Sequence, residues 1–94
     1  MKKEFIIKIY KKKAGERSET FVREIWSGYD KKTAFEGGRA ELVRIANCDI
    51  DRGLSESSKN DILEEIKSIE NGSDNYYYDQ TTWFFKIFSK SIKN

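Results

Sequence analysis

The residue types that usually carry enzyme chemistry are scarce in this chain of 94 residues. It contains no histidine, the side chain best suited to proton transfer near neutral pH and to metal binding. Its single cysteine, Cys48, has no histidine to activate it and follows the end of a predicted helix instead of starting one. We expect Cys48 to be a buried or half-buried packing residue, and we expect a protein that is not an enzyme.

One polar cluster has the residue types of a metal site but not the spacing. Oxygen-bearing residues alternate in the set Asn47, Asp49, Asp51, with a glycine at position 53. A calcium-binding loop that starts at residue 47 needs its glycine at position six and a glutamate at position twelve. Arg52 and Ser58 occupy those positions. We therefore interpret residues 47–57 as a polar connection and expect neither a metal nor a cofactor.

Aromatic residues in the last quarter of the chain are the stronger candidates for function. Seven of them fall within thirteen residues: Tyr76, Tyr77, Tyr78, Trp83, Phe84, Phe85 and Phe88. Aromatic rings anchor protein interfaces, and they also stack on the bases of single-stranded nucleic acids. Which of these rings are available depends on the elements that carry them.

Three segments have the composition and alternation of strands. Residues 4–11 place Phe5, Ile7 and Ile9 on one face and Lys8 on the other, with Ile6 and Tyr10 assigned to that second face less firmly. Residues 20–29 are rich in β-branched and aromatic types and are expected to form a hairpin with the first strand. Residues 80–90 alternate again, whereas residues 73–78 are predicted to be a turn or a short strand.

Two segments between these strands have helical periodicity. Thr33 and Glu36 have the spacing of a capping box, which predicts a helix start at Thr33, and Gly38 falls on the apolar face of that helix. We interpret Gly38 as a point of close approach to the sheet. A second helix is predicted from a cap at Ser58 to a stop at residues 71–72, with isoleucines at helical spacing.

These elements predict an α+β fold in one domain covering residues 1–94. The expected order is ββααβ, with a mainly antiparallel three-stranded sheet and both helices on one face. With three strands in this order, the third strand would be antiparallel to the second and parallel to the first, so the strand order stays open. Either arrangement leaves one face of the sheet without a helical cover.

The uncovered face is expected to be partly apolar. The last strand would bury Trp83, Phe85 and Ile87 and point Phe84 and Phe88 outward. In the second strand, Phe21 and Ile25 would face one way and Val22 and Trp26 the other, which leaves the buried face of that strand undecided. A loop, the segment 76–78 or a second copy of the chain would cover these rings, or the face is an interaction surface.

We expect a non-enzymatic protein-binding module, with a protein partner or self-association. A small, lysine-rich chain without catalytic residues is of the kind that phages and other mobile elements encode as inhibitors or accessory, anti-defence proteins. The alternatives are a nucleic-acid-binding domain and, ranked last, a small enzyme. The predicted partner-binding residues are Phe84, Phe88, Lys86, Lys90, Tyr10, Lys8, Trp26, Tyr76, Tyr77 and Tyr78.

The charge distribution favours a protein partner, and the apolar patterning favours a cytoplasmic location for this chain. The formal net charge is +2, and the basic ends flank an acidic region at residues 49–79, which would repel a nucleic acid from part of the surface. Glu4 and Lys8 interrupt the apolar stretch that a secretion signal needs, and no run approaches the length of a membrane span.

Overall fold

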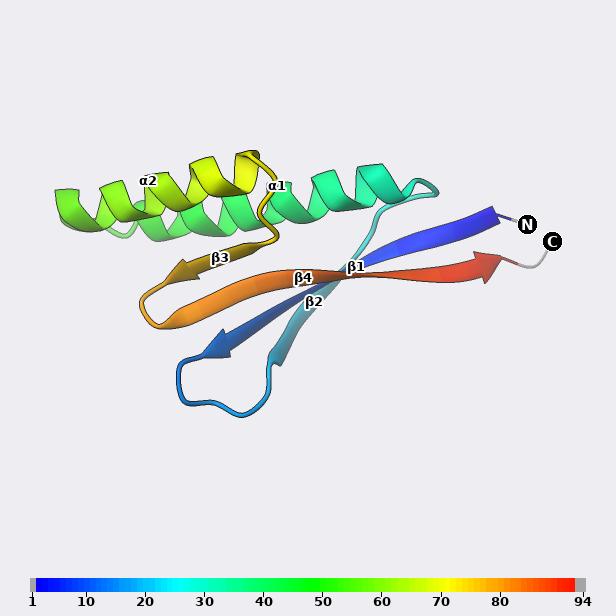
Figure 1. Cartoon of the computed structure of the whole chain (residues 1–94), viewed down its shortest axis with the longest axis horizontal. Coiled ribbons are helices and arrows are strands. Elements are labelled where there is room, and N and C mark those ends of the chain that lie inside the picture. The colour runs from blue at the N-terminus through cyan, green and yellow to red at the C-terminus, as the bar shows by residue number, and fades with distance from the viewer. Residues whose placement is uncertain (1, 93–94) are drawn as a thin grey trace.

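The computed structural model describes residues 2–92, and the side chains within residues 3–91, as an α+β fold of two layers (Figure 1). The elements are, in chain order, β1 (Lys2–Lys13), β2 (Thr20–Trp26), α1 (Lys31–Ile50), α2 (Glu56–Glu70), β3 (Asn75–Tyr78) and β4 (Thr81–Ile92). Figure 1 shows both helices on the same side of the sheet. In the described part of the chain no helix is long and apolar enough to cross a membrane.

The sheet has four strands in the order β2-β1-β4-β3, and every neighbouring pair is antiparallel. The prediction of three strands was wrong, because residues 75–78 pair with the start of β4. The two-residue turn between β3 and β4, Asp79-Gln80, has positive φ at both positions, as the tight hairpin turns that match strand twist require. This extra hairpin reverses the chain, so β4 runs antiparallel to β1 and not parallel as predicted.

Helix α1 begins and ends at other residues than the sequence indicates. Asp30 is the N-cap: its carboxylate accepts hydrogen bonds from the Thr33 amide at 3.2 Å and from the Thr33 hydroxyl at 2.7 Å. The predicted Thr33 cap was therefore wrong by one turn. These bonds lower the pKa of Asp30. The helix also continues to Ile50, through residues that were assigned to a polar connection.

Helix α2 has the predicted face and end but an earlier start. Ser55 is its N-cap and accepts a hydrogen bond from the Ser58 amide at 3.3 Å, so the predicted cap at Ser58 was one turn late. The helix ends at Glu70, and Gly72 follows with a φ of 113°, which favours glycine. The stop at residues 71–72 is thus confirmed.

The core lies between the helices and the facing side of the sheet. Its apolar members are Ile7, Ile9, Ala34, Leu42, Ile45, Ala46, Ile62, Ile66, Ile69, Tyr76 and Phe85. The predicted close approach at Gly38 is confirmed: a Cβ atom there would lie 2.5 Å from Cδ2 of Phe85. The missing side chain of Gly38 therefore lets α1 pack directly against the ring of Phe85.

A polar contact is built into one end of this core. The hydroxyl of Tyr76 donates a 2.7 Å hydrogen bond to Oδ2 of Asp49, and both residues are buried. Burial, followed by this bond, strongly raises the pKa of Tyr76. Arg52 reaches the other oxygen of Asp49 at 3.6 Å. Asp49 is therefore a structural residue that joins α1 to β3, and not part of a loop as predicted.

Candidate functional site on the outer face of the sheet

The candidate site is the face of the sheet that points away from the helices, called here the outer face. Strand register arranges its central side chains in three rows across β2, β1 and β4. An apolar row, a charged row and a second apolar row follow one another: Trp26-Ile6-Phe88, Glu24-Lys8-Lys86 and Phe21-Tyr10-Phe84. Within residues 2–92, no helix packs over this face.

A β-bulge places both aromatic residues of β2 on the outer face. Ile9 pairs with Arg23, but the next residue, Tyr10, pairs with Phe21, so Val22 is the extra residue. Strict alternation predicts Phe21 and Trp26 on opposite faces, and this prediction was wrong because the bulge changes the parity of the strand. Arg23 points to the helix side, where its guanidinium contacts the carboxylate of Glu41.

The rings of the second apolar row pack against one another. Tyr10 stacks on Phe84 with ring centroids 5.6 Å apart and an interplanar angle of 17°. Phe21 meets the same Tyr10 ring edge-on at 5.8 Å. These contacts hold Tyr10 and Phe84 half-buried, and they form a preordered apolar ridge instead of three independent side chains.

Large apolar surfaces nevertheless stay open to solvent. Trp26 is 58% exposed, Phe21 53% and Phe88 42%. Contiguous apolar surface that is rimmed by polar residues is typical of interaction sites. The outer face therefore combines exposed anchors at its edges with a packed ridge.

The two lysines of the charged row, Lys8 and Lys86, each lie near a carboxylate and an aromatic ring. Lys86 Nζ lies 2.8 Å from Oε1 of Glu19, which precedes β2, and 4.9 Å from the ring centroid of Tyr10. Lys8 Nζ lies 3.9 Å from Oε1 of Glu24 and 4.7 Å from the ring centroid of Phe88. Both signs of charge are thus interspersed with the aromatic rings.

The pairing of Lys86 with Glu19 shifts the pKa values of both groups. The hydrogen bond from Lys86 lowers the pKa of the Glu19 carboxyl, and the same bond raises the pKa of Lys86. Both groups are exposed, so the pair mainly sets the charge pattern of the face and adds little to folding.

Most of the predicted partner-binding residues do lie on the outer face. Its rows contain Phe84, Phe88, Lys86, Tyr10, Lys8 and Trp26. Lys90 stands further along β4, directly opposite Glu4 of β1. The predicted partner-binding set left out Phe21, Ile6, Glu24 and Glu19, although Ile6 had been assigned to the face of Lys8. The bulge hid Phe21, and the hairpin brings Glu19 near.

The three consecutive tyrosines do not act as one group. Tyr76 is buried on the helix side, so its assignment to a partner-binding surface was wrong. Tyr78 is half-buried, whereas Tyr77 is 51% exposed and pairs with the outward-facing Thr82. The segment extends the sheet as β3 and does not fold over the outer rings. The backbone amide of Tyr77 donates a 2.9 Å hydrogen bond to Oε1 of Glu65, so this amide of the edge strand already has a partner.

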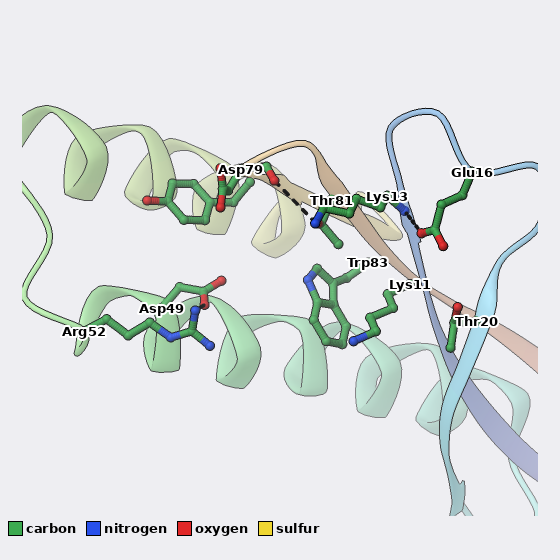
Figure 2. A pocket seen from close by; sticks show the side chains of 10 residues that line it. Lys11, Lys13, Glu16, Thr20, Asp49, Arg52, Asp79, Thr81 and Trp83 are labelled. Carbon is green, nitrogen blue, oxygen red and sulfur yellow. Dashed lines mark hydrogen bonds and ion pairs between the residues drawn. The ribbon is translucent and has the colours of Figure 1, made fainter.

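A cavity of about 350 Å³ lies on the helix side, at the end of the sheet near the β3–β4 turn. Figure 2 shows its lining side chains, which come from the strands, the β1–β2 loop, the β3–β4 turn and the residues at and just after the end of α1. They carry three bases and three acids: Lys11, Lys13, Arg52, Glu16, Asp49 and Asp79. Asp49 is already bonded to Tyr76, and Lys11 Nζ lies over the ring of Trp83 at 5.4 Å. The charges of this cavity therefore compensate one another and select no ligand charge.

Cys48 is exposed on α1, and the prediction of a packing role was wrong. The helix extends to Ile50, and Cys48 lies on its exposed side, where Arg44 Nη1 contacts Sγ at 3.8 Å. The described residues bring together no group of three or more acidic or cysteine side chains that could hold a metal ion.

Comparisons with family models, with curated proteins and with solved structures find no match to this chain.

Proposed function

We propose that the protein is a non-enzymatic binding module that recognises a protein through the outer face of its sheet. The observation that carries the proposal is the pair of apolar rows that flank the charged row of the outer face: Tyr10 packs between Phe21 and Phe84 in one row, and Trp26, Phe21 and Phe88 stay open to solvent. Aromatic side chains in such a setting concentrate binding energy. A module of this kind acts by occupying the surface of its partner, as inhibitors and accessory subunits do.

The charge pattern favours a protein over a nucleic acid. A nucleic acid requires cations that are free to replace counterions on phosphates. The ammonium groups of Lys86 and Lys8 instead have carboxylate partners on the protein itself. A phosphate that binds these lysines would have to displace the carboxylates of Glu19 and Glu24 from them. The two carboxylates would remain nearby and repel the phosphate. A protein surface, which carries both signs, suits the outer face better.

The test is the double variant Phe84→Ala with Phe88→Ala. Burial of each ring against a partner is worth about 1.5 to 3 kcal/mol before ordering costs, so loss of both should remove most of the affinity. Leu63→Ala is the matched control, because Leu63 is 48% exposed on α2, away from the outer face. Each immobilised protein is used to capture partners from soluble extract of the organism that encodes it, after circular dichroism has checked its fold.

We expect the same protein to be captured by the wild type and by Leu63→Ala, and to be lost with the double variant. Capture that does not depend on Phe84 and Phe88 would contradict the proposal. A double variant that unfolds, beside a wild type that binds nothing, would show that these rings serve the core. Fluorescence anisotropy with a mixed-sequence single-stranded oligonucleotide tests the alternative: binding that weakens steeply with salt, with a slope that falls by about one for Lys86→Ala, would favour a nucleic acid.

A further inference from the structure

We propose that the free edge of β2 receives an extended segment of a partner protein, which joins the sheet as a further strand antiparallel to β2. The inference rests on the proposed function in taking the partner to be a protein, and it adds the conformation and the chemistry of the part that binds. Two observations carry it: the edge of β2 is open whereas the edge of β3 is closed, and the open edge carries a charge and an exposed ring that select a partner.

The edge of β3 is closed by the protein itself. The amides of Asn75 and Tyr77, which alternate along this strand, donate to Oγ of Ser73 at 3.5 Å and to Oε1 of Glu65 at 2.9 Å. Helix α2 also packs against β3. Native proteins block edge strands in such ways, because unpaired backbone groups are a template for another strand.

The edge of β2 has no such protection over residues 23–27. Ser27 donates its amide to the carbonyl of Phe5 in β1. Because backbone groups alternate between the two edges of a strand, the amides of Glu24 and Trp26 point away from β1. The described residues 2–92 provide no hydrogen-bond partner for these two amides, and β1 is the one strand or helix whose backbone packs against β2. β2 also lacks the lysine and proline residues that commonly protect an edge.

An extended backbone is the group that fits this edge. The open donors and acceptors belong to Glu24 and Trp26, and two strand residues span about 6.8 Å. An antiparallel segment repeats this spacing, so two of its residues pair with Glu24 and Trp26 and share the outer face with them. The open stretch is as long as an ordinary short strand, which is enough for such pairing.

The side chains beside the open edge define what the segment must carry. More than half of the Glu24 side chain is exposed, and its carboxylate lies as far as 3.9 Å from Lys8, so it can accept a closer cation. Trp26 is exposed, and the exposed ring of Tyr29 meets it edge-on at 5.8 Å. The segment should therefore place a basic residue beside Glu24 and, two residues away, an apolar residue beside Trp26.

A second copy of β2 suits this edge less well. Two identical strands that pair antiparallel set the residue at the centre of the pairing against its own copy. With Glu24 at the centre, two carboxylates oppose each other. With Ile25 at the centre, each Glu24 faces the ring of Trp26. Neither register gives Glu24 a cation, so charge complementarity favours a foreign segment.

A synthetic peptide of this chemistry is the probe. It is a threonine-rich strand with the central sequence isoleucine-valine-lysine, so that antiparallel pairing sets its isoleucine beside Trp26 and its lysine beside Glu24. Isotope-labelled wild type is titrated with the peptide from about 10 μM to about 2 mM, a range that includes weak affinities, and followed by NMR. We expect the amide protons of Glu24 and Trp26 to exchange quickly without peptide, and to move downfield and exchange slowly with it. The amide of Ile25, which points to β1, should change little.

Methylation of single peptide nitrogens separates backbone pairing from side-chain contact. The amides of the isoleucine and the lysine point at β2, so methylation of either should weaken binding about tenfold. The amide of the valine points away from β2, and its methylation is the matched control that should leave the affinity unchanged. Exchange of the lysine for glutamate should weaken binding about fivefold, as expected for an exposed ion pair.

A pair of variants makes the same separation on the protein. Glu24→Pro removes an outward amide that the sheet does not use, a position at which an edge strand tolerates proline. Glu24→Thr removes the same charge and keeps the amide. After circular dichroism has checked both folds, Glu24→Pro should lose peptide binding, and Glu24→Thr should keep it within about fivefold.

Peptide binding that leaves the amides of Glu24 and Trp26 unshifted, or that tolerates methylation at every position, would overturn the proposal. Absence of binding at about 2 mM would do the same, while the capture experiment above still decides whether the outer face binds a protein. Shifts of these amides with protein concentration, in the absence of peptide, would show that a second copy occupies the edge instead.

Discussion

Substitution of Gly38 by alanine tests the packing that holds α1 against the sheet. The new Cβ would lie 2.5, 2.6 and 2.7 Å from Cδ2, Cε2 and Cγ of Phe85, distances that real Cβ contacts do not show. The ring cannot simply turn away, because Phe85 is 6% exposed and Phe35 packs edge-on against it. Either α1 or the ring must shift.

Two opposing effects set the magnitude. Alanine is favoured over glycine inside a helix by about 1 kcal/mol. Overpacking of a core costs about 1 to 3 kcal/mol, and a clash with three atoms of one enclosed ring belongs in the upper half of that range. We therefore expect Gly38→Ala to lower the free energy of unfolding by about 1 to 2 kcal/mol, or Tm by roughly 5 to 15 °C for a chain of this size.

Gly37→Ala is the matched control, since it makes the same change one residue earlier. Its Cβ would lie 3.0 Å from Cδ1 of Ile7, the far end of a side chain that can shift slightly. It should cost less than Gly38→Ala. Urea unfolding followed by tryptophan fluorescence measures both, and Phe85→Leu should recover part of the loss in the Gly38→Ala background. A Gly38→Ala protein as stable as the wild type would refute the close packing.

Two further predictions concern polar contacts outside the outer face. Tyr76→Phe removes the buried bond to Asp49 and should destabilise the fold by about 1.5 to 3 kcal/mol in urea unfolding at neutral pH. The pKa of Tyr76 is raised in the folded state, so above about pH 10 the unfolded chain loses the Tyr76 proton first, and the contribution of Tyr76 to the free energy of unfolding declines. The difference in stability between wild type and Tyr76→Phe should therefore shrink above about pH 10. A constant difference would contradict this account. Ser55→Ala removes the α2 cap and should lower the free energy of unfolding by about 1 kcal/mol, measured by thermal unfolding. A larger loss for Ser58→Ala would show that Ser58, and not Ser55, is the cap.

Local periodicity was enough to assign the faces of the two long strands. In β1 and β4 each side chain alternates with its neighbours, so the inward position of Phe85 and the outward positions of Phe84 and Phe88 follow from residue spacing. The isoleucines of α2 were assigned correctly for the same reason. Gly38 was also predicted to meet the sheet, because an apolar helix face with no side chain at one position permits close approach.

The sequence did not determine where the helices start, because each helix has two nearby residues that can act as its N-cap. Asp30 and Thr33 can both cap α1, as Ser55 and Ser58 can both cap α2. The choice depends on where the chain turns out of β2 or out of α1, and that turn is set by the packing of the helices. The errors were each one turn, and they left the apolar faces unchanged.

Contacts between distant residues decided the rest of the candidate site. The bulge at Val22 exists because β2 pairs with β1, and it alone brings Phe21 to the same face as Trp26. β3 is four residues long, too short for alternation to be recognised, and it is a strand because β4 pairs with it. Tyr76 resembles its neighbours in sequence, yet Asp49, 27 residues earlier, provides the partner that allows its hydroxyl to be buried. The amino-acid pattern thus determined which side chains can share a face, whereas pairing and burial across long sequence separations determined which of them reach the surface.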